Sequence, residues 1–386
     1  MYKRNQVFAV ACIALLQFGI ILITLGSILP SITAKFGLDE LNAGKLVSIL
    51  PAGILFGSLV FGPVADRYGY KVLLIVSILV SIIGLEGLSF TNSLTVLYIC
   101  IFITGLGGGI INGGTNALVA DISADYKDAN LSLLGVFFGI GALGMPLLLG
   151  VLSKFYQYPV IISGVCVLML LTVLYFLTIK FPSPKHSQGF PVTEGIKLLK
   201  EPALLLTGFF LFFQSGVEGL INNWTTTFMK LKVNAVQEDA LYALTFYVVG
   251  LTLTRLILGS LLKKMSSFTL QLISLLLIIS GSVLIAYSYS YPPAFAGLII
   301  VGIGLSAGFP IILGYVGQLY EKLSGTAFSI ALVIALAGNT IINYFFGIIA
   351  HHYTAAKLPF LVIACVVGMI VILFFIKHKI AKRIKL

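Results

Sequence analysis

One carboxylate, Glu218, lies in the middle of an otherwise apolar stretch of the chain, residues 214–229. A charged side chain near the centre of a bilayer costs about 2.5–3.5 kcal/mol on insertion scales, so an acid kept there indicates a function and a partner. Gln214, Asn222 and Thr225 recur with Glu218 at helical spacing and form one polar stripe. Because lipid offers no hydrogen bonds, we expect this face to line protein or a water-filled pathway.

Glu218 is the candidate ion-coupling residue. A carboxyl group in a low-dielectric cavity can take up and release a proton, and its oxygens could also hold a sodium ion. The alternative is a glutamate that only ties its helix to a neighbour. Counting helical rise from the cytoplasmic helix ends puts Glu218 roughly 22 Å and Arg255 roughly 10 Å into the membrane. Arg255 is therefore expected at a cytoplasmic gate, or to snorkel to the interface, and not beside Glu218.

A second set of polar side chains could bind hydroxyl groups. Asn112 and Asn116 lie one helical turn apart, so both amides can point into the same space, either to bind a solute or to bond neighbouring helices. Trp224, the single tryptophan, could be an aromatic platform for a sugar or an anchor at the membrane interface. The other substrate-binding candidates are the amides of Gln17, Gln214, Asn222, Asn223, Asn339 and Asn343. Amides with an aromatic platform suit a hexose, which has several hydroxyls and no charge.

The composition places these residues in a membrane protein. Hydrophobic residues make up 59% of the chain and charged residues 10%, and the mean hydropathy is +1.09. The net charge of +11 does not indicate nucleic acid, because Lys and Arg lie in short loops and tails. The four cysteines occur singly, and no catalytic triad, metal-ligand spacing or phosphate loop is found. We expect neither an enzyme nor a cofactor, and no metal except sodium at Glu218.

Twelve apolar runs approach the roughly 20 residues that a helix needs to span a bilayer. They are residues 7–29, 43–64, 72–90, 95–120, 130–153, 157–180, 203–229, 239–262, 268–288, 294–319, 324–350 and 356–376. Most Lys and Arg residues fall on the side that holds the N-terminus, so both termini are expected in the cytoplasm, in a multi-pass protein of the plasma (inner) membrane. Pro51, Pro146 and Pro310 supply places where these helices can bend during gating.

The longest polar interruption, residues 181–202, contains four prolines and divides the chain. It predicts an N-terminal six-helix half at 1–180, a cytoplasmic linker at 181–202 and a C-terminal six-helix half at 203–386. Gln17 and Gln214 occupy equivalent places in the two halves, as do several glycines. The predicted fold is an all-α membrane protein of twelve transmembrane helices in two pseudo-repeats, which is typical of alternating access.

The loop between the second and third runs, residues 62–74, carries a charged turn. Gly69 permits a tight turn, Asp66 can lie against the positive N-terminus of a neighbouring helix, and Arg67 can bind nearby acids. These gating residues would form a latch that holds one state closed. The alternative is an ordinary solvated turn.

The same loop resembles the major facilitator superfamily, whose signature here is G-x-x-x-D-R-x-G-R-R. The matching residues are Gly62, Asp66, Arg67 and Gly69. Lys71 keeps the second basic position, whereas Tyr70 departs from it and puts the strength of the basic network in question. The resemblance implies a monomer, and it implies that Asp66 meets the start of the helix near Ser324 and Gly325.

Two further helices resemble one branch of that superfamily. The run GLGGGIINGGTNALV, residues 105–119, is similar to a helix of the fucose:proton symporter group. The pattern of Gly216, Glu218 and Trp224 resembles sodium-dependent glucose transporters and bacterial hexose permeases. The chain departs from the fucose symporter pattern in lacking an acid in the first helix and in placing Asn112 at the acid position of the fourth, so coupling falls to Glu218.

The sequence thus predicts a secondary symporter of a neutral sugar, a hexose, driven by a proton or sodium gradient across the lipid bilayer. The alternatives are an exporter of drugs or small metabolites by proton antiport and a membrane sensor that binds without transport. A membrane enzyme is a further alternative, weakened by the missing catalytic groups.

Overall fold

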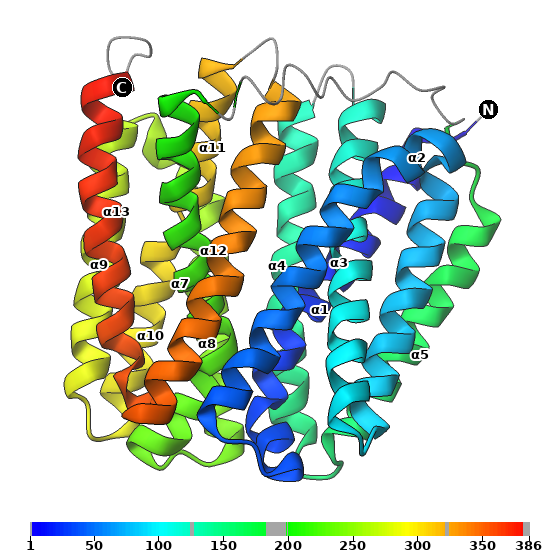
Figure 1. The fold of residues 1–386 in the computed structure, drawn as a ribbon. Helices are drawn as coiled ribbons and strands as arrows, with labels where there is room; N and C mark the ends of the chain where they lie inside the picture. The colour runs from blue at the N-terminus through cyan, green and yellow to red at the C-terminus, as the bar shows by residue number, and fades with distance from the viewer. Residues whose placement is uncertain (1, 124–126, 183–197, 199, 321–323, 381–386) are drawn as a thin grey trace. The chain divides into compact units, whose positions relative to one another are not determined.

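The computed structural model describes the chain except residues 1, 124–126, 183–197, 199, 321–323 and 381–386. The described residues are almost entirely helical (Figure 1). The helices are α1 (Arg4–Phe36), α2 (Glu40–Phe90), α3 (Leu94–Ile122), α4 (Lys127–Leu152), α5 (Tyr158–Thr178), α7 (Pro202–Val233), α8 (Gln237–Leu262), α9 (Ser267–Tyr287), α10 (Tyr291–Leu305), α11 (Gly308–Leu319), α12 (Ser324–His352) and α13 (Leu358–Ile380), with a short 3-10 turn, η2, at Ala355–Lys357.

Twelve segments of the described chain are long and apolar enough to cross a membrane. Helix α2 supplies two of them, Glu40–Phe61 and Tyr68–Phe90, and α10 and α11 together form one, Tyr291–Leu319. The predicted all-α fold with twelve spans is confirmed, and the chain is an integral, multi-pass membrane protein.

Helix α2 contains one non-helical residue, at the turn that the sequence predicts. Gly69 has φ 81° and ψ 162°, a backbone conformation that residues other than glycine rarely adopt. The prediction that Gly69 makes a tight turn between two spans is confirmed.

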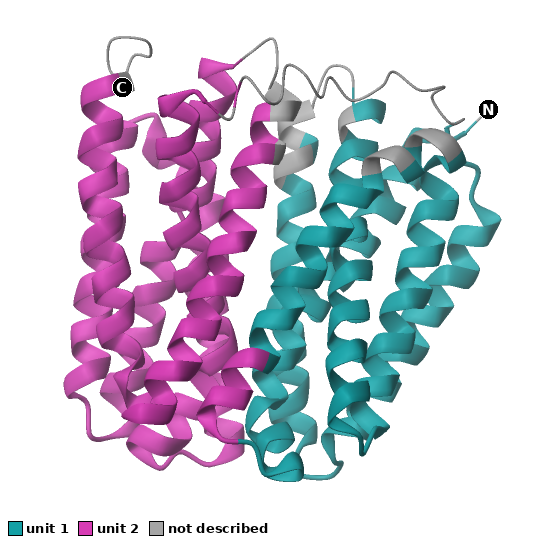
Figure 2. Ribbon diagram, in the orientation of Figure 1, with its two compact units in different colours: residues 1–38, 46–189 teal, residues 39–45, 190–386 magenta. Residues whose placement is uncertain are grey.

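The chain forms two compact units (Figure 2). Unit 1 comprises residues 1–38 and 46–189, and unit 2 comprises residues 39–45 and 190–386. Within unit 1, α1 packs mainly on α4 and α3. Within unit 2, α7 packs mainly on α12 and α13, and α10 packs on α8 and α9.

Glycines allow close helix packing in unit 1, as the runs of glycine in residues 105–114 predict. Gly105 and Gly109 lie directly against the backbone of the first span of α2, and Gly107 lies against its second span. Gly108 faces α1. A side chain at these positions would meet the neighbouring helix, so the small residues set the distance between the helices.

The first turn of α2 belongs to unit 2, although the sequence places it in the first half of the chain. Gly44 lies so close to Gly347 of α12 that a Cβ on either would overlap the other's backbone. Asp39 caps this turn by accepting the backbone N–H of Asn42 at 2.9 Å. Its other carboxylate oxygen lies 3.3 Å from Nδ1 of His351, at the end of α12.

The span formed by α10 and α11 is interrupted at Ser306 and Ala307. Pro310, four residues after Ser306, has no N–H and therefore cannot donate the helical hydrogen bond to the Ser306 carbonyl. The sequence predicts that this proline can bend a helix, and the structure breaks the helix one turn before it. The Ser306 carbonyl therefore lacks its helical donor within a membrane span.

Candidate functional site

Glu218 and Arg255 face each other from neighbouring helices of unit 2. Oε2 of Glu218, on α7, lies 3.8 Å from Nη2 of Arg255, on α8. The glutamate side chain is 14% exposed and the arginine side chain 28% exposed. Each charge is the counter-charge that the other requires inside a membrane.

The prediction that Arg255 lies too far from Glu218 to pair with it is wrong. That estimate took the ends of the two helices as markers of membrane depth and left out the length of the side chains. Helix α7 has 32 residues, which is about 48 Å at 1.5 Å per residue. A hydrocarbon core is only about 30 Å thick, so α7 extends beyond it and its end does not report the depth of Glu218.

The break between α10 and α11 lies against the same pair of helices. Nε of Arg255 donates to the Ser306 carbonyl at 3.4 Å, which is the carbonyl that Pro310 leaves without its helical donor. Nε2 of Gln214, one turn before Glu218 on α7, donates to the Leu305 carbonyl at 3.0 Å. Two polar side chains thus satisfy the free carbonyls of the broken helix.

Several buried polar atoms of this site have no hydrogen-bond partner among the described residues. They are Oε1 of Gln214, Oε2 of Glu218 and the hydroxyl of Tyr247 on α8. Tyr247 interacts electrostatically with both Glu218 and Arg255. An unpaired buried polar group is costly, so these atoms mark a place where a solute, an ion or water would bind.

The amides of α7 and α12 form a ladder of hydrogen bonds. Nδ2 of Asn223 donates to Oδ1 of Asn343 at 3.2 Å, and Nδ2 of Asn343 donates to Oδ1 of Asn339 at 2.9 Å. Nδ2 of Asn339 donates to Oγ of Ser215 at 3.4 Å. Gly219 leaves room for the ladder, because a Cβ there would overlap both α12 amides. The structure therefore brings three predicted substrate-binding residues together, and it bonds them to one another.

Trp224 and Asn222, which flank Asn223 in the chain, are both buried. Trp224 is 1% exposed and packs edge-on against Phe346 of α12, with 4.8 Å between the ring centres. An interface anchor needs contact with the lipid headgroups, so that alternative for Trp224 is wrong. Its role as a platform for a solute stays a prediction.

The remaining amide candidates lie in unit 1. Nε2 of Gln17, on α1, donates to Oγ1 of Thr172 on α5 at 2.5 Å, and its buried Oε1 has no partner among the described residues. Nδ2 of Asn116 lies 3.2 Å from Oδ1 of Asn112 and donates to the Asn112 carbonyl at 2.8 Å. The two asparagines of α3 share one space, as predicted.

The predicted latch is described only in part. The side chains of Asp66, Arg67 and Ser324 lie outside the described residues, so their contact stays a prediction. Tyr70, which departs from the signature, donates to Oδ2 of Asp121 on α3 at 2.6 Å.

Lys71, the basic residue that the signature retains, acts at a helix end. Its Nζ donates to the carbonyls of Leu177 and Ile179, at 2.6 Å and 3.0 Å. A cation there stabilises the negative end of α5. Among the described side chains of the loop, the neutral donor Tyr70 and the cation Lys71 both bind neighbouring helices.

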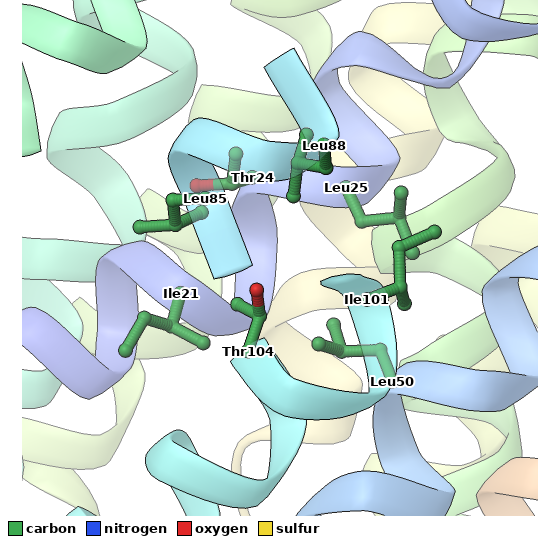
Figure 3. A pocket seen from close by; sticks show the side chains of 8 residues that line it. All are labelled: Ile21, Thr24, Leu25, Leu50, Leu85, Leu88, Ile101 and Thr104. Carbon is green, nitrogen blue, oxygen red and sulfur yellow. The ribbon is translucent and has the colours of Figure 1, made fainter. Parts of the chain in front are cut away.

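A pocket in unit 1 has a different character (Figure 3). It is lined by Ile21, Thr24, Leu25, Leu50, Leu85, Leu88, Ile101 and Thr104. The hydroxyls of Thr24 and Thr104 donate to the carbonyls of Ile20 and Cys100 in their own helices. The pocket therefore presents hydrocarbon and no free polar donor, unlike the site around Glu218.

Comparison with known proteins gives one family and several distant relatives. The profile of the Major Facilitator Superfamily matches residues 7–291. The cis,cis-muconate transport protein of Acinetobacter baylyi is 28% identical over 288 residues, which cover 68% of each chain. The crystal structure of a D-xylose-proton symporter superposes with a TM-score of 0.79 at 15% identity, covering 95% of this chain and 97% of that one. A nucleoside transporter structure superposes with a TM-score of 0.80 at 16% identity, covering 97% and 99%.

Proposed function

Since the chain belongs to the Major Facilitator Superfamily, we propose that it is a secondary active transporter in which Glu218 couples the movement of a small solute to that of a proton. The observation that carries this proposal is the pair of Glu218 and Arg255, 3.8 Å apart inside membrane spans. Protonation of Glu218 removes one of the two charges and so changes what Arg255 can bind. Alternating access of the two halves, with both termini in the cytoplasm, completes the proposal.

Arg255 favours a proton over sodium at Glu218. Two unit charges 3.8 Å apart interact by about 4 kcal/mol at an effective dielectric constant of about 20. A sodium ion at the carboxylate would be repelled by the guanidinium with an energy of that order. A proton becomes part of a neutral carboxyl group and meets no such repulsion. The same repulsion disfavours export of a cationic drug through this site.

Two classes of solute, a neutral sugar and a carboxylic acid, are each supported by different features of the chain. Symport of a neutral sugar, the hexose expected from the sequence, is supported by the unpartnered amide oxygens of Gln17 and Gln214 and by the fold shared with a D-xylose-proton symporter. Transport of a carboxylic acid is supported by the relative named for cis,cis-muconate and by the cation at Arg255.

The test is solute uptake into proteoliposomes with an imposed proton gradient, using labelled hexoses, xylose and cis,cis-muconate. Wild-type protein is expected to accumulate its solute, whereas Glu218→Gln should lose accumulation and retain exchange of solute for solute. Glu86→Gln is the matched control, because Glu86 is also a membrane acid and accepts a hydrogen bond from Ser163 on α5 at 2.9 Å. Equal proton-driven accumulation in wild type and Glu218→Gln would refute the coupling role.

A further inference from the structure

The guanidinium of Arg255 has unused capacity to bind an anion. It carries five N–H donors. Its contacts among the described residues are the Ser306 carbonyl at 3.4 Å, near the limit for a hydrogen bond, and Glu218 at 3.8 Å, beyond that limit. These two partners hold Arg255 in place and leave most of its N–H donors available.

Arg255 lies on a face of α8 that packs against protein on both sides of it. Leu251 and Leu258, one turn before and one turn after it, are both buried. Leu253 and Ile257, which are 58% and 55% exposed, lie on other faces of α8, whereas Gly259, one turn after Arg255, is exposed and has open space in front of it. A charged side chain on the protein-facing side of a membrane helix lines protein or a water-filled space.

We propose that the transported solute is a small organic anion whose carboxylate binds the guanidinium of Arg255 in place of Glu218, which is protonated in that state. This inference rests on the proposed function and adds the class of solute. The planar guanidinium matches a carboxylate through two parallel N–H···O bonds. The hydroxyl of Tyr247, which has no partner among the described residues, is a further donor beside the pair.

Charge balance links one proton to each carboxylate. The empty site holds one positive and one negative charge. A second carboxylate at Arg255 would leave one negative charge uncompensated, and a proton on Glu218 restores neutrality. No bond other than that O–H forms, and the proton comes from the aqueous side together with the solute.

The surroundings of Glu218 contain no other described charge that would alter this balance. Arg255 is the charged group that acts on Glu218, and Tyr247 is the titratable group beside it, both on α8. Helix α12 presents the amides of Asn339 and Asn343, and the α10–α11 break presents backbone carbonyls. A monocarboxylate would therefore move with one proton and without net charge.

A binding experiment tests this on the full-length protein in detergent, with the fluorescence of Trp224 as the reporter. Lactate and benzoate are the carboxylate probes, and glucose and xylose are the neutral probes. We expect a carboxylate to bind wild type with an affinity that falls about tenfold for each pH unit once Glu218 ionises. Glu218→Gln should bind the same probe with no such pH dependence.

Variants at Arg255 separate binding from folding. Arg255→Gln should lose at least 100-fold in affinity for the carboxylate. Arg255→Lys, which keeps the charge and loses the paired donors, should lose about 10-fold. Lys263→Gln, an exposed cation at the end of α8, is the matched control and should bind as wild type does.

The outcomes distinguish the two proposals. Proton-linked uptake of a sugar with an affinity unchanged in Arg255→Gln, and no binding of either carboxylate, would overturn the anion inference and leave the proposed function standing. Carboxylate binding with the same pH dependence in wild type and Glu218→Gln would also overturn the inference. A protein that moves none of the probes and no protons in liposomes would overturn both.

Discussion

The amide ladder between α7 and α12 predicts a specific loss of stability in Asn343→Leu. Asn343 is fully buried and makes three side-chain hydrogen bonds, one from Asn223 and two to Asn339. Polar hydrogen bonds inside membrane proteins contribute about 0.6 kcal/mol each on average. Leucine has a similar volume and no polar atoms, so the replacement removes all three bonds with little change in packing. We expect the free energy of unfolding to fall by about 2 kcal/mol.

The assay is reversible unfolding in mixed micelles with increasing SDS, followed by tryptophan fluorescence. Trp224 is the single tryptophan, adjoins Asn223 in the chain and packs on Phe346 of α12. Its emission therefore reports the contact between α7 and α12. The control is Thr340→Val on α12, because the Thr340 hydroxyl donates only within its own helix, to the Leu336 carbonyl at 3.0 Å. Its expected loss is at most one bond, about 0.6 kcal/mol.

The same variant distinguishes a structural amide from one that binds solute. If Asn343→Leu unfolds at the same SDS concentration as Thr340→Val, the ladder does not hold the two helices together. If its stability is unchanged and the KM for the transported solute rises, Asn343 binds solute, as the sequence predicts. A loss of about 2 kcal/mol with an unchanged KM supports the ladder.

Three further replacements test other contacts. Arg255→Leu is expected to destabilise the protein by about 3–5 kcal/mol, because it leaves Glu218 as an uncompensated buried charge. Adding Glu218→Gln should recover most of that loss in the SDS assay, and equal losses in the single and double variants would contradict the ion pair. Tyr70→Phe removes the hydrogen bond to the carboxylate on α3 and should cost about 1 kcal/mol, read from thermal unfolding; an unchanged midpoint would speak against that bond. Gly44→Val overpacks the contact of α2 with α12 and should destabilise the protein by about 1–3 kcal/mol. Gly164→Val is the control, because open space lies in front of Gly164, and it should unfold thermally as wild type does. Similar effects at both sites would show that close packing at Gly44 is not the cause.

The twelve spans could be predicted because a bilayer leaves few choices. Lipid cannot satisfy backbone polar groups, so long apolar runs must be helices, and their number follows from hydropathy. Glu218 stood out for the same reason, since its apolar neighbours make an acid conspicuous. Gly69 was predictable because only glycine readily adopts its positive φ.

The contacts around Glu218 depend on quantities that hydropathy does not contain. The depth of a residue in the membrane cannot be counted from the end of a helix that is longer than the membrane is thick. Counting in that way placed Arg255 too far from Glu218 for the two side chains to pair. Two signals pointed to the site nonetheless. Arg255 is a lone cation in an apolar run of the half that holds Glu218, and Pro310 must leave the Ser306 carbonyl without a helical donor.

The amides show a second limit, which is the rotation of a helix about its axis. Asparagine offers the same donors and acceptors to a sugar hydroxyl and to another asparagine. Which of the two it meets depends on how α7 and α12 pack, and that packing is set by the missing side chain of Gly219. The residue types were predictable from the sequence, and their partners required the structure.

If Glu218 takes up the proton, as we propose, the two contacts of Arg255 would let that proton act on unit 2. When Glu218 is ionised, the guanidinium lies between a carboxylate at 3.8 Å and the Ser306 carbonyl at 3.4 Å. Protonation removes the stronger attraction, so the guanidinium is left to the carbonyl or to an incoming anion. The carbonyl belongs to the break between α10 and α11, where helical hydrogen bonds are already missing and bending is least costly. A saturated, well-aligned ion pair would hold this part of unit 2 in one position, whereas under the proposed coupling the long contacts seen here would let a proton on Glu218 loosen it.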